Sequence, residues 1–442
     1  MLESRLLLHL TYKVISMTRK RLTNLSRRDF GRVSMVALGG ALAGPSLAAN
    51  SDRPRVTEIF GEVAPGFERV KAAFAANFEQ HGEVGAACSV YHRGKKVVDL
   101  WGGVADEGSG RLWARDSIVL VFSSTKGATA VCAHILAQRG ELDLDAPVAE
   151  YWPEFAAAGK QGIPVRWLLT HQVGLPVLDK PLAMEDFLAW EPPVNALAAQ
   201  RPKWDGRTAH GYHAMTYGWL VGEVVRRGSG KSLGTFFADE VAGPLGLDFW
   251  IGLPEDKESR MSPMIMLDFE NPSAVEPKTE KARELMKAVV DPDSYLTQEQ
   301  TTTPLDINTR GFRAAEFPAA NGITDARSLA RMYASLIGEG VDGVRLFNDE
   351  TMTRASTEQV FDRDQVTGVP TRFGLGFSLY RKNSNMIQDG VFGHGGAGGS
   401  VGYAAPKAGI GFGYVMNKMQ MVGDDDPRSL GLTQAVHASL KG

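Results

Sequence analysis

The chain has 442 residues, of which 43% are hydrophobic and 22% charged, with a formal net charge of -3 at pH 7. This length predicts two or three folding units, and the composition excludes long disorder, collagen and a helical membrane bundle. The nearly neutral balance gives no reason to expect a nucleic-acid partner. Two cysteines are too few for a disulfide framework, and no Cys/His cluster has the spacing of a zinc site. We therefore expect a soluble globular protein, most simply an enzyme.

The first 49 residues have the order of an export signal. Arg27-Arg28 precede a weakly apolar run over 33–47, and the small residues Ser46-Leu47-Ala48-Ala49 end it. The paired arginines indicate the twin-arginine export machinery as a partner, with cleavage near residue 49 and a periplasmic or secreted mature protein. The alternatives are a basic, frayed N-terminus and a start at Met17. We expect no stable membrane anchor, because glycines and a proline interrupt a run shorter than about 18 apolar residues.

Helical and strand patterns alternate in the next part of the chain. Spacing of apolar residues predicts, in order, a helix over Phe67–Phe78, strands over Ala86–His92 and Lys96–Trp101 joined by Arg93-Gly94, and a helix from Ser123 to its cap at Gly140. From Leu142 to about Asp306 strand patterning is lost. Helices separated by proline and glycine replace it, for example Met215–Arg227.

Strand patterns return near the C-terminus. The predicted elements are a helix after Asp325 that ends at Ile337, paired strands within Phe392–Met416, and a terminal helix over Ser429–Leu440. These elements predict an α+β fold, with an antiparallel sheet flanked by helices and built from both chain ends around an inserted helical domain. The expected division is 1–49 for the signal, 50–140 and 311–442 for the two parts of the α/β domain, and 141–310 for the helical domain with insertions.

Ser123-Ser124-Thr125-Lys126 is the sharpest candidate for chemistry. Residues i and i+3 of a helix are neighbours about 5–6 Å apart, so the lysine can reach the hydroxyl of Ser123. The helix N-terminus favours negative charge that develops there. This is a nucleophile with its own activator. The alternative is a serine that caps the helix beside a solvated lysine.

Tyr212 is the candidate to help Lys126. A lysine with a pKa near 10.4 is neutral in only about one molecule in 2,500 at pH 7, so it needs burial or a second cation to act as a base. A tyrosine beside it could share the task, and Tyr212 lies just before a predicted helix. The alternative is a half-buried structural tyrosine.

The third element is the glycine-rich run over 393–400, Gly-His-Gly-Gly-Ala-Gly-Gly-Ser. Glycines let a backbone approach a ligand closely, and an edge strand here could offer an N–H group to an oxyanion. The run also satisfies G-x-G-x-x-G and G-x-S-x-G. We discount a dinucleotide fold because Tyr403-Ala404-Ala405-Pro406 is a poor helix start. We discount an α/β-hydrolase elbow because too little chain follows to supply an acid and then a histidine.

Together these elements resemble the serine β-lactamase and penicillin-binding-protein superfamily, in the class C-like branch that includes family VIII carboxylesterases. The resemblance covers roughly residues 60–420. Further stretches that are similar to the family are Gly140–Val148, Val165–Pro176, Gly243–Leu247, Ile251–Pro254 and Ala320–Thr324.

The resemblance implies a role for each motif. Ser123 matches the acylated serine, Lys126 its activating lysine, and Tyr212 the tyrosine that exchanges protons with the nucleophile and the leaving group. The implied oxyanion hole uses the backbone N–H groups of Ser123 and Ala397. Either Lys126 or Tyr212 could be the general base, and the resemblance implies no cofactor and no metal.

Two departures from the β-lactamase pattern bear on the substrate. Ala214 stands where that pattern has an asparagine, and His394-Gly395-Gly396 replaces lysine-threonine-glycine, so His394, Gly395 and Gly396 become the expected substrate-binding residues. A histidine is mostly neutral at pH 7, whereas a lysine offers a permanent charge to a substrate carboxylate. His394 could hydrogen-bond the substrate or Tyr212, or could be a structural histidine beside a turn.

The predicted function is therefore a serine hydrolase that cleaves small, uncharged carboxylic esters through an acyl-serine intermediate. The first alternative is an amide-cleaving relative, such as a β-lactamase or a D-amino-acid peptidase. An acyltransferase is a smaller variant, because an alcohol could intercept the acyl-serine. From a different class, the chain could be a non-catalytic binding protein on the same scaffold.

Overall fold

The structure is a computed structural model that describes residues 57–268, 276–277, 279–302, 306–381, 384–386, 388 and 390–441. The predicted export signal over 1–49 lies outside the described residues. Residues Thr57–Gly442 group into one unit by their internal contacts. The division of this unit at residues 140 and 310 stays a prediction.

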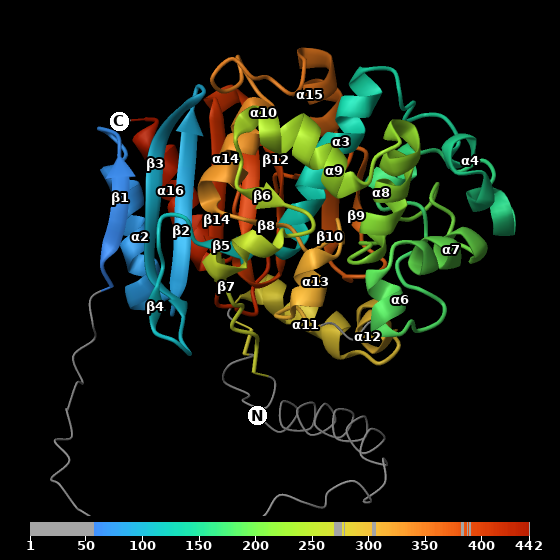
Figure 1. Cartoon of the computed structure of the whole chain (residues 1–442), viewed down its shortest axis with the longest axis horizontal. Helices are drawn as coiled ribbons and strands as arrows, with labels where there is room; N and C mark the ends of the chain where they lie inside the picture. The colour runs from blue at the N-terminus through green and yellow to red at the C-terminus, as the bar shows by residue number, and fades with distance from the viewer. Residues whose placement is uncertain are drawn as a thin grey trace, which may run out of the picture. The chain divides into compact units, whose positions relative to one another are not determined.

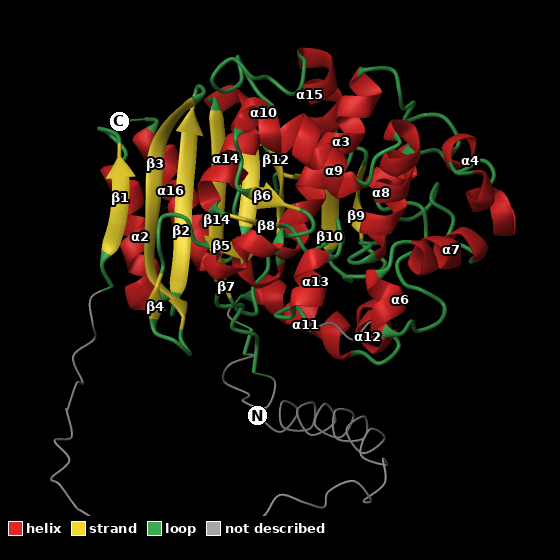
Figure 2. Cartoon of the chain, in the orientation of Figure 1, coloured by secondary structure: helices red, strands yellow, loops and turns green. Residues whose placement is uncertain are grey.

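A large antiparallel sheet is built from both ends of the described chain, which confirms the predicted fold class (Figures 1 and 2). Its N-terminal strands are supplied by residues 59–112 and its C-terminal strands by residues 360–416. The strand order is β1 (Ile59–Val63), β3 (Lys95–Asp106), β2 (Gly85–His92), β14 (Ile410–Met416), β13 (Val401–Ala405), β12 (Phe392–Gly395), β11 (Ser378–Leu379), β10 (Pro370–Phe373) and β9 (Val360–Arg363), with β4 (Arg111–Leu112) paired to β3.

Strand β14 joins the two halves of this sheet. It pairs with β2 over Met416↔Ala86 to Ile410↔His92 and with β13 on its other side. Successive side chains of a strand point to opposite faces of the sheet, and helices cover both faces. Gly411 and Gly413 of β14 face helix α14 (Ala326–Ser335), and a Cβ on either would stand 2.5 Å from its backbone. Glycine there allows helix and sheet to pack closely.

The other face is covered by helices from opposite ends of the described chain, α2 (Glu68–Gln80) and α16 (Pro427–Ser439), which pack on each other. Both helices and the strands β2, β3 and β12–β14 lie where the apolar periodicity predicted them. Helix α14 begins as predicted at Asp325, whose carboxylate accepts a hydrogen bond from the Ser328 N–H at 2.7 Å. This is an ordinary N-cap, and it explains why the sequence signal was reliable there.

The middle of the chain is mainly helical, but it also contributes strands that the periodicity did not predict. A second sheet has the order β6 (Phe249–Trp250), β8 (Ile323–Thr324), β5 (Ile118–Leu120) and β7 (Met261–Ser262). The expectation that strands are absent between Leu142 and Asp306 was wrong for β6 and β7. Two-residue strands are too short to show alternation.

Helix α3 (Thr125–Gln138) packs against α8 (Thr216–Ser229), and further helices lie in the described part of the chain. They are α4 (Val148–Tyr151), α5 (Arg166–Leu169), α6 (Met184–Leu188), α7 (Glu191–Ala199), α9 (Leu233–Phe237), α10 (Gly243–Leu245), α11 (Glu280–Val290), α12 (Tyr295–Thr302), α13 (Arg310–Ala314) and α15 (Asp349–Ser356).

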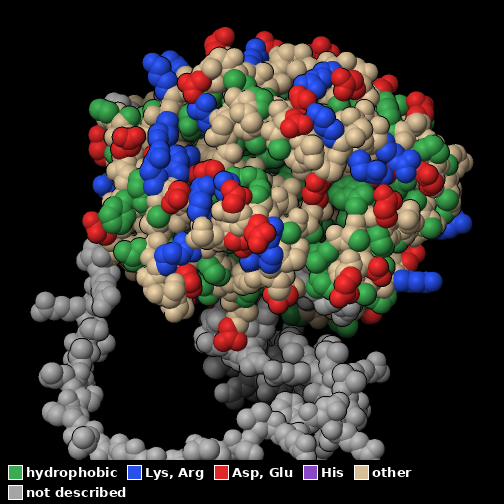
Figure 3. Space-filling model, in the orientation of Figure 1, with side chains coloured by type: hydrophobic (Ala, Val, Ile, Leu, Met, Phe, Trp, Pro, Cys, Tyr) green, Lys and Arg blue, Asp and Glu red, His purple; other side chains and the backbone are tan. Residues whose placement is uncertain are grey.

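The described surface is mixed in charge. Figure 3 shows acidic and basic side chains interspersed over one face. Among the described residues, no helix has the length and apolarity needed to span a bilayer.

Candidate active site

Ser123 lies in a single 3-10 turn, Phe122–Ser124, between strand β5 and helix α3. Phe122 has a φ of 45°, which is unusual for a residue with a side chain. Such strain costs about 1–3 kcal/mol and persists only where the surroundings impose it. Here Val121 N–H donates to Gly322 O at 2.9 Å, and Gly322 N–H donates to the Thr125 hydroxyl at 2.8 Å. The second sheet therefore holds the turn that carries the serine.

Lys126 is fully buried and faces Ser123, with 3.1 Å between Lys126 Nζ and Ser123 Oγ. The ammonium nitrogen also donates to the carbonyl oxygens of Ala214 at 2.6 Å and Ala319 at 3.0 Å. This geometry contradicts a solvated lysine, and no side chain caps the N-terminus of α3. When the amine is neutral, the two carbonyls still accept its N–H groups, and its lone pair can accept a proton.

Asn321 explains how Ala319 comes to face the lysine. Its side-chain amide donates to Phe312 O at 2.9 Å and to Ala315 O at 2.6 Å, and its carbonyl oxygen accepts from Phe317 N–H at 3.0 Å. These three bonds fold residues 312–321 into a tight loop. Asn321 is buried, so it acts here as a positioning residue for the Ala319 carbonyl.

Tyr212 lies four residues before α8, and its ring centroid is 4.9 Å from Lys126 Nζ. The structure therefore brings Ser123, Lys126 and Tyr212 together as predicted, while their catalytic roles stay predictions. The tyrosine ring stacks on Phe373 of strand β10, at 6.3 Å between centroids and 7° between planes. The site thus contains residues from the segment before α8, which carries Tyr212, and from the C-terminal part of the large sheet, which carries Phe373.

Asp364 ties these two parts together, and the sequence analysis did not identify it. One carboxylate oxygen accepts from the N–H groups of Tyr212 at 3.0 Å, Val366 at 2.9 Å and Thr367 at 2.9 Å. The other accepts from the Thr371 hydroxyl at 3.0 Å. The carboxylate is buried and makes charge-assisted hydrogen bonds, which are roughly twice as strong as neutral ones. Asp364 therefore fixes the backbone at Tyr212.

The ring of His171 packs against Tyr212, and the ring of His213 packs against His171. His213 Nδ1–H donates to Gly211 O at 2.6 Å, while His213 Nε2 accepts from Leu175 N–H at 2.9 Å. Burial lowers the pKa of His213 to about 3, and it lowers that of His171 well below its usual range. Both rings are therefore neutral structural groups at pH 7. Among the described residues, no group of three metal-ligating side chains is close enough to hold an ion.

The glycine-rich run forms strand β12 and the loop after it. The expectation of an edge strand was wrong, because β12 lies between β11 and β13. However, β11 pairs only with Phe392 and Gly393, so the ladder on that side stops before His394 and Gly395. The turn that carries Ser123 packs against β12, and Ser124 Oγ donates to His394 O at 3.3 Å. The short β11 thus leaves His394 and Gly395 of an interior strand outside its ladder.

Gly396 and Ser400 join this loop to the serine turn. Ser400 Oγ donates to Val121 O at 2.8 Å, and a Cβ on Gly396 would stand 2.1 Å from the same oxygen. Glycine is therefore required for close approach of the two backbones. Ala397 follows directly, is exposed, and begins a short turn over Ala397–Gly399. Its predicted role as an oxyanion donor stays a prediction.

His394 is buried in strand β12, with its ring centroid 6.1 Å from that of Tyr212. Its Nδ1–H donates to Gly395 O at 2.7 Å, so Nε2 carries the lone pair. Nε2 is buried without a hydrogen-bond partner among the described residues. Burial, together with the charge of Lys126, lowers the pKa of His394 to about 3. The ring is therefore a neutral acceptor rather than a cation.

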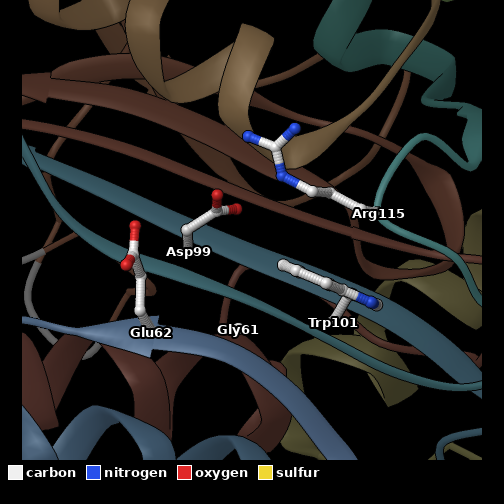
Figure 4. A pocket seen from close by; sticks show the side chains of 5 residues that line it. All are labelled: Gly61, Glu62, Asp99, Trp101 and Arg115. Carbon is white, nitrogen blue, oxygen red and sulfur yellow. The ribbon is translucent and has the colours of Figure 1, made fainter.

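A surface cavity of about 300 Å³ lies elsewhere and shares none of these residues. It is lined by Gly61, Glu62, Asp99, Trp101 and Arg115 (Figure 4). Strand β3 is four positions from β12 in the sheet, which is about 19 Å at the usual strand spacing. The chemistry of the reactive groups, and not the size of a cavity, identifies the site at Ser123.

Comparison with known proteins agrees with this arrangement. A model of the Beta-lactamase family matches residues 70–436. Esterase/beta-lactamase LipL of Mycobacterium tuberculosis (strain ATCC 25618 / H37Rv) is 36% identical over 375 residues, 82% of this chain and 83% of that protein.

Two solved structures are similar over most of the chain. A family VIII carboxylesterase is 38% identical, with a TM-score of 0.76, and the match covers 86% of this chain and 100% of that one. A novel penicillin-binding protein homolog from Caulobacter crescentus is 33% identical, with a TM-score of 0.77 and coverage of 86% and 100%. With the family match spanning most of its length, the chain belongs to the Beta-lactamase family and is a serine hydrolase.

Proposed function

We propose that this serine hydrolase cleaves small, uncharged carboxylic esters and that Ser123 is its nucleophile. The observation that carries the proposal is the buried Lys126 amine, 3.1 Å from Ser123 Oγ and held by two backbone carbonyls. A serine hydroxyl is a weak nucleophile, and an adjacent base activates it.

In the first half-reaction Ser123 Oγ attacks the ester carbonyl carbon, and its proton passes to Lys126 or Tyr212. The carbonyl oxygen becomes an oxyanion between the backbone N–H groups of Ser123 and Ala397. Each such donor is worth about 10²–10³ in rate. Collapse of the intermediate breaks the bond to the alkoxide, which takes a proton from Tyr212; where Lys126 took the serine proton, it passes that proton on to Tyr212. In the second half-reaction water attacks the acyl-serine by the same route and releases the acid.

The neutral state of His394 supports an uncharged substrate. With its Nδ1–H committed to Gly395 O, the ring offers only the Nε2 lone pair, which can accept a hydrogen bond. It provides no positive charge for a substrate carboxylate at pH 7. Ala214 likewise offers no polar side chain, and its carbonyl is already bonded to Lys126.

The comparisons also favour ester cleavage. One relative is named an esterase/beta-lactamase and one similar structure is a family VIII carboxylesterase. The same names make β-lactam hydrolysis the second candidate. A penicillin-binding protein homolog is similar as well, so amide cleavage is the class against which the proposal must be tested.

Steady-state kinetics with p-nitrophenyl butyrate and nitrocefin separate these candidates. We expect kcat/KM for the ester to exceed that for nitrocefin by at least about 100-fold. Such a ratio corresponds to a difference of about 2.7 kcal/mol in transition-state binding. Mass spectrometry of the butyrylated enzyme locates the acyl group at Ser123. Nitrocefin turnover above ester turnover would make the enzyme a β-lactamase, and absence of any turnover or acylation would favour a binding protein.

We further propose export by the twin-arginine route, on the strength of Arg27-Arg28 and the small residues before position 50. Replacing both arginines with lysine should retain the protein in the cytoplasmic fraction. A control variant, Arg21→Lys, lies outside the pair and should leave fractionation unchanged. Equal periplasmic amounts of the wild type and the double-lysine variant would refute this route.

A further inference from the structure

Arg428 is a fully buried cation in the first turn of helix α16, on the far side of the large sheet from α14. Its guanidinium contacts two carboxylates, Asp426 at 2.9 Å and Glu83 at 3.3 Å. It also donates to Lys418 O at 3.1 Å and, through Nη2, to Gly398 O. The last contact lies in the loop that bears Ala397.

The loop is shaped to lie directly on this guanidinium. Gly398 and Gly399 have φ values of 84° and 129°, in a region that side chains disfavour. A Cβ on Gly399 would stand 2.2 Å from Arg428 Nη2 and 2.5 Å from Asp426 Oδ2. No side chain other than hydrogen fits between the loop and the ion pair.

Backbone hydrogen bonds within the loop hold residues 396–400 in a turn. Gly396 N–H donates to Ser400 O at 2.7 Å, and Gly399 N–H donates to Gly396 O at 3.1 Å. Those bonds set the turn but not its position against the sheet. Three bonds set that position: the bond from Ser400 Oγ to Val121 O described above, a bond from Gln420 N–H to Gly398 O at 3.3 Å, and the charged bond from Arg428 to the same Gly398 O, one residue after the predicted oxyanion donor Ala397.

A contribution to the free energy of folding does not by itself explain why Arg428, Asp426 and Glu83 are buried together. Replacing such a cluster with packed apolar groups is often neutral or stabilising. A charged donor, however, holds a carbonyl more firmly and in a narrower geometry than a neutral one. Burial opposes the charge on Arg428, but the carboxylates of Glu83 and Asp426 more than offset this, so its pKa is raised and the guanidinium stays charged.

We propose that Arg428 is a positioning residue that fixes the Ala397 N–H for the oxyanion by holding the Gly398 carbonyl. This proposal rests on the proposed function, since it assigns a support to the same reaction. It predicts that loss of the Gly398 bond weakens binding of the transition state while binding of the ground state is kept.

The test is Arg428→Lys, which keeps the charge but cannot reach the two carboxylates and Gly398 O together. We expect kcat for p-nitrophenyl butyrate to fall by about 10- to 100-fold with KM within threefold, less than the loss of a whole donor. Affinity for butylboronic acid, whose tetrahedral adduct with serine places an oxygen in the oxyanion hole, should fall by a similar factor. Inhibition by butyrate should not change.

Arg226→Lys is the matched control, because Arg226 pairs with the buried Glu223 at 2.8 Å on helix α8, away from the loop. It should lower the thermal midpoint without changing kcat or boronate affinity. Should Arg428→Lys fail to fold, Glu83→Gln replaces it. This variant removes one carboxylate from the guanidinium and should lower kcat about threefold, again with KM unchanged.

A folded Arg428→Lys variant with wild-type kcat and boronate affinity would overturn the positioning role. So would equal losses in kcat and boronate affinity for Arg226→Lys. Failure of the proposed function looks different, because the wild type itself would then show no ester turnover and no acylated Ser123.

Discussion

Ser123→Ala is expected to lower kcat for p-nitrophenyl butyrate by at least about 10⁴-fold, since the loss of a catalytic serine costs up to about 10⁶ in related chemistry. The hydroxyl of Ser123 lies 3.1 Å from Lys126 Nζ and can form the acyl-enzyme, whereas the two carbonyls that hold the amine cannot replace it. A fluorophosphonate probe should label the wild type stoichiometrically and leave the variant unlabelled. KM should change little, because the hydroxyl contributes mainly to the transition state.

Ser124→Ala provides the matched control in the next residue. Ser124 Oγ is buried and bonds His394 O at 3.3 Å and Ser400 Oγ at 3.2 Å, so it supports the loop without reaching the lysine. We expect less than a tenfold loss of kcat and full labelling. In the proposed mechanism Ser123 and Lys126 act as a unit, so Ser123→Ala with Lys126→Met should be no slower than Ser123→Ala alone. Labelling retained by Ser123→Ala would place the nucleophile elsewhere.

The enzyme is expected to lose a large part of its folding stability between pH 6.5 and pH 4.5. Burial lowers the pKa of His134 to about 4 and that of His213 and His394 to about 3. In the unfolded chain these groups titrate near pH 6.5. Below that pH the unfolded state binds more protons than the folded state, so the free energy of unfolding falls as the pH falls. Above pH 6.5 the effect vanishes.

The size of this effect follows from linkage. Each histidine costs about 1.4 kcal/mol per pH unit in this window, or about 2 kcal/mol at pH 5, and three together cost about 6 kcal/mol. A typical domain has only about 5–15 kcal/mol in total. Burial raises the pKa of Glu83 and Asp325, which works in the opposite direction and offsets part of the loss.

His134 allows the effect to be measured away from the active site. Its Nε2 bonds Leu375 O at 2.8 Å, and its ring packs between Phe347 and Phe377. In urea unfolding followed from pH 7 to pH 4.5, His134→Phe should reduce the pH slope by about 1.4 kcal/mol per unit. Phe347→Leu, a packing control, should lower stability equally at every pH. A slope unchanged by His134→Phe would show that this ring does not drive acid unfolding.

The parts of the site that the sequence predicted are those with a local signal. The spacing of Ser123 and Lys126 is one helical turn, and glycines mark the loop that approaches them. The sheet from both chain ends followed from strand periodicity, which is strong in β2, β3 and β14. Tyr212 was a candidate because it lies just before a predicted helix, but its role came from a resemblance, because nothing near it in the chain distinguishes it from a structural tyrosine.

The parts that the sequence could not predict depend on contacts between distant segments. The carbonyls of Ala214 and Ala319 that hold the lysine belong to residues with no polar side chain. Asp364 is 152 positions from Tyr212 in the chain, and Arg428 is 30 positions from Gly398. The interior position of β12 also depended on pairing with the two residues of β11, which are too few to show a period.

Strand β14 between β2 and β13 has a consequence for biosynthesis. Residues beyond 390 must emerge from the ribosome before the serine turn meets the loop that completes the reaction centre. On the proposed mechanism, we therefore expect a nascent polypeptide that already contains Ser123 and Lys126 to be inert toward esters until the residues after 390 are released. Long-range pairing of this kind is slow to form, so the appearance of hydrolytic activity should report completion of folding.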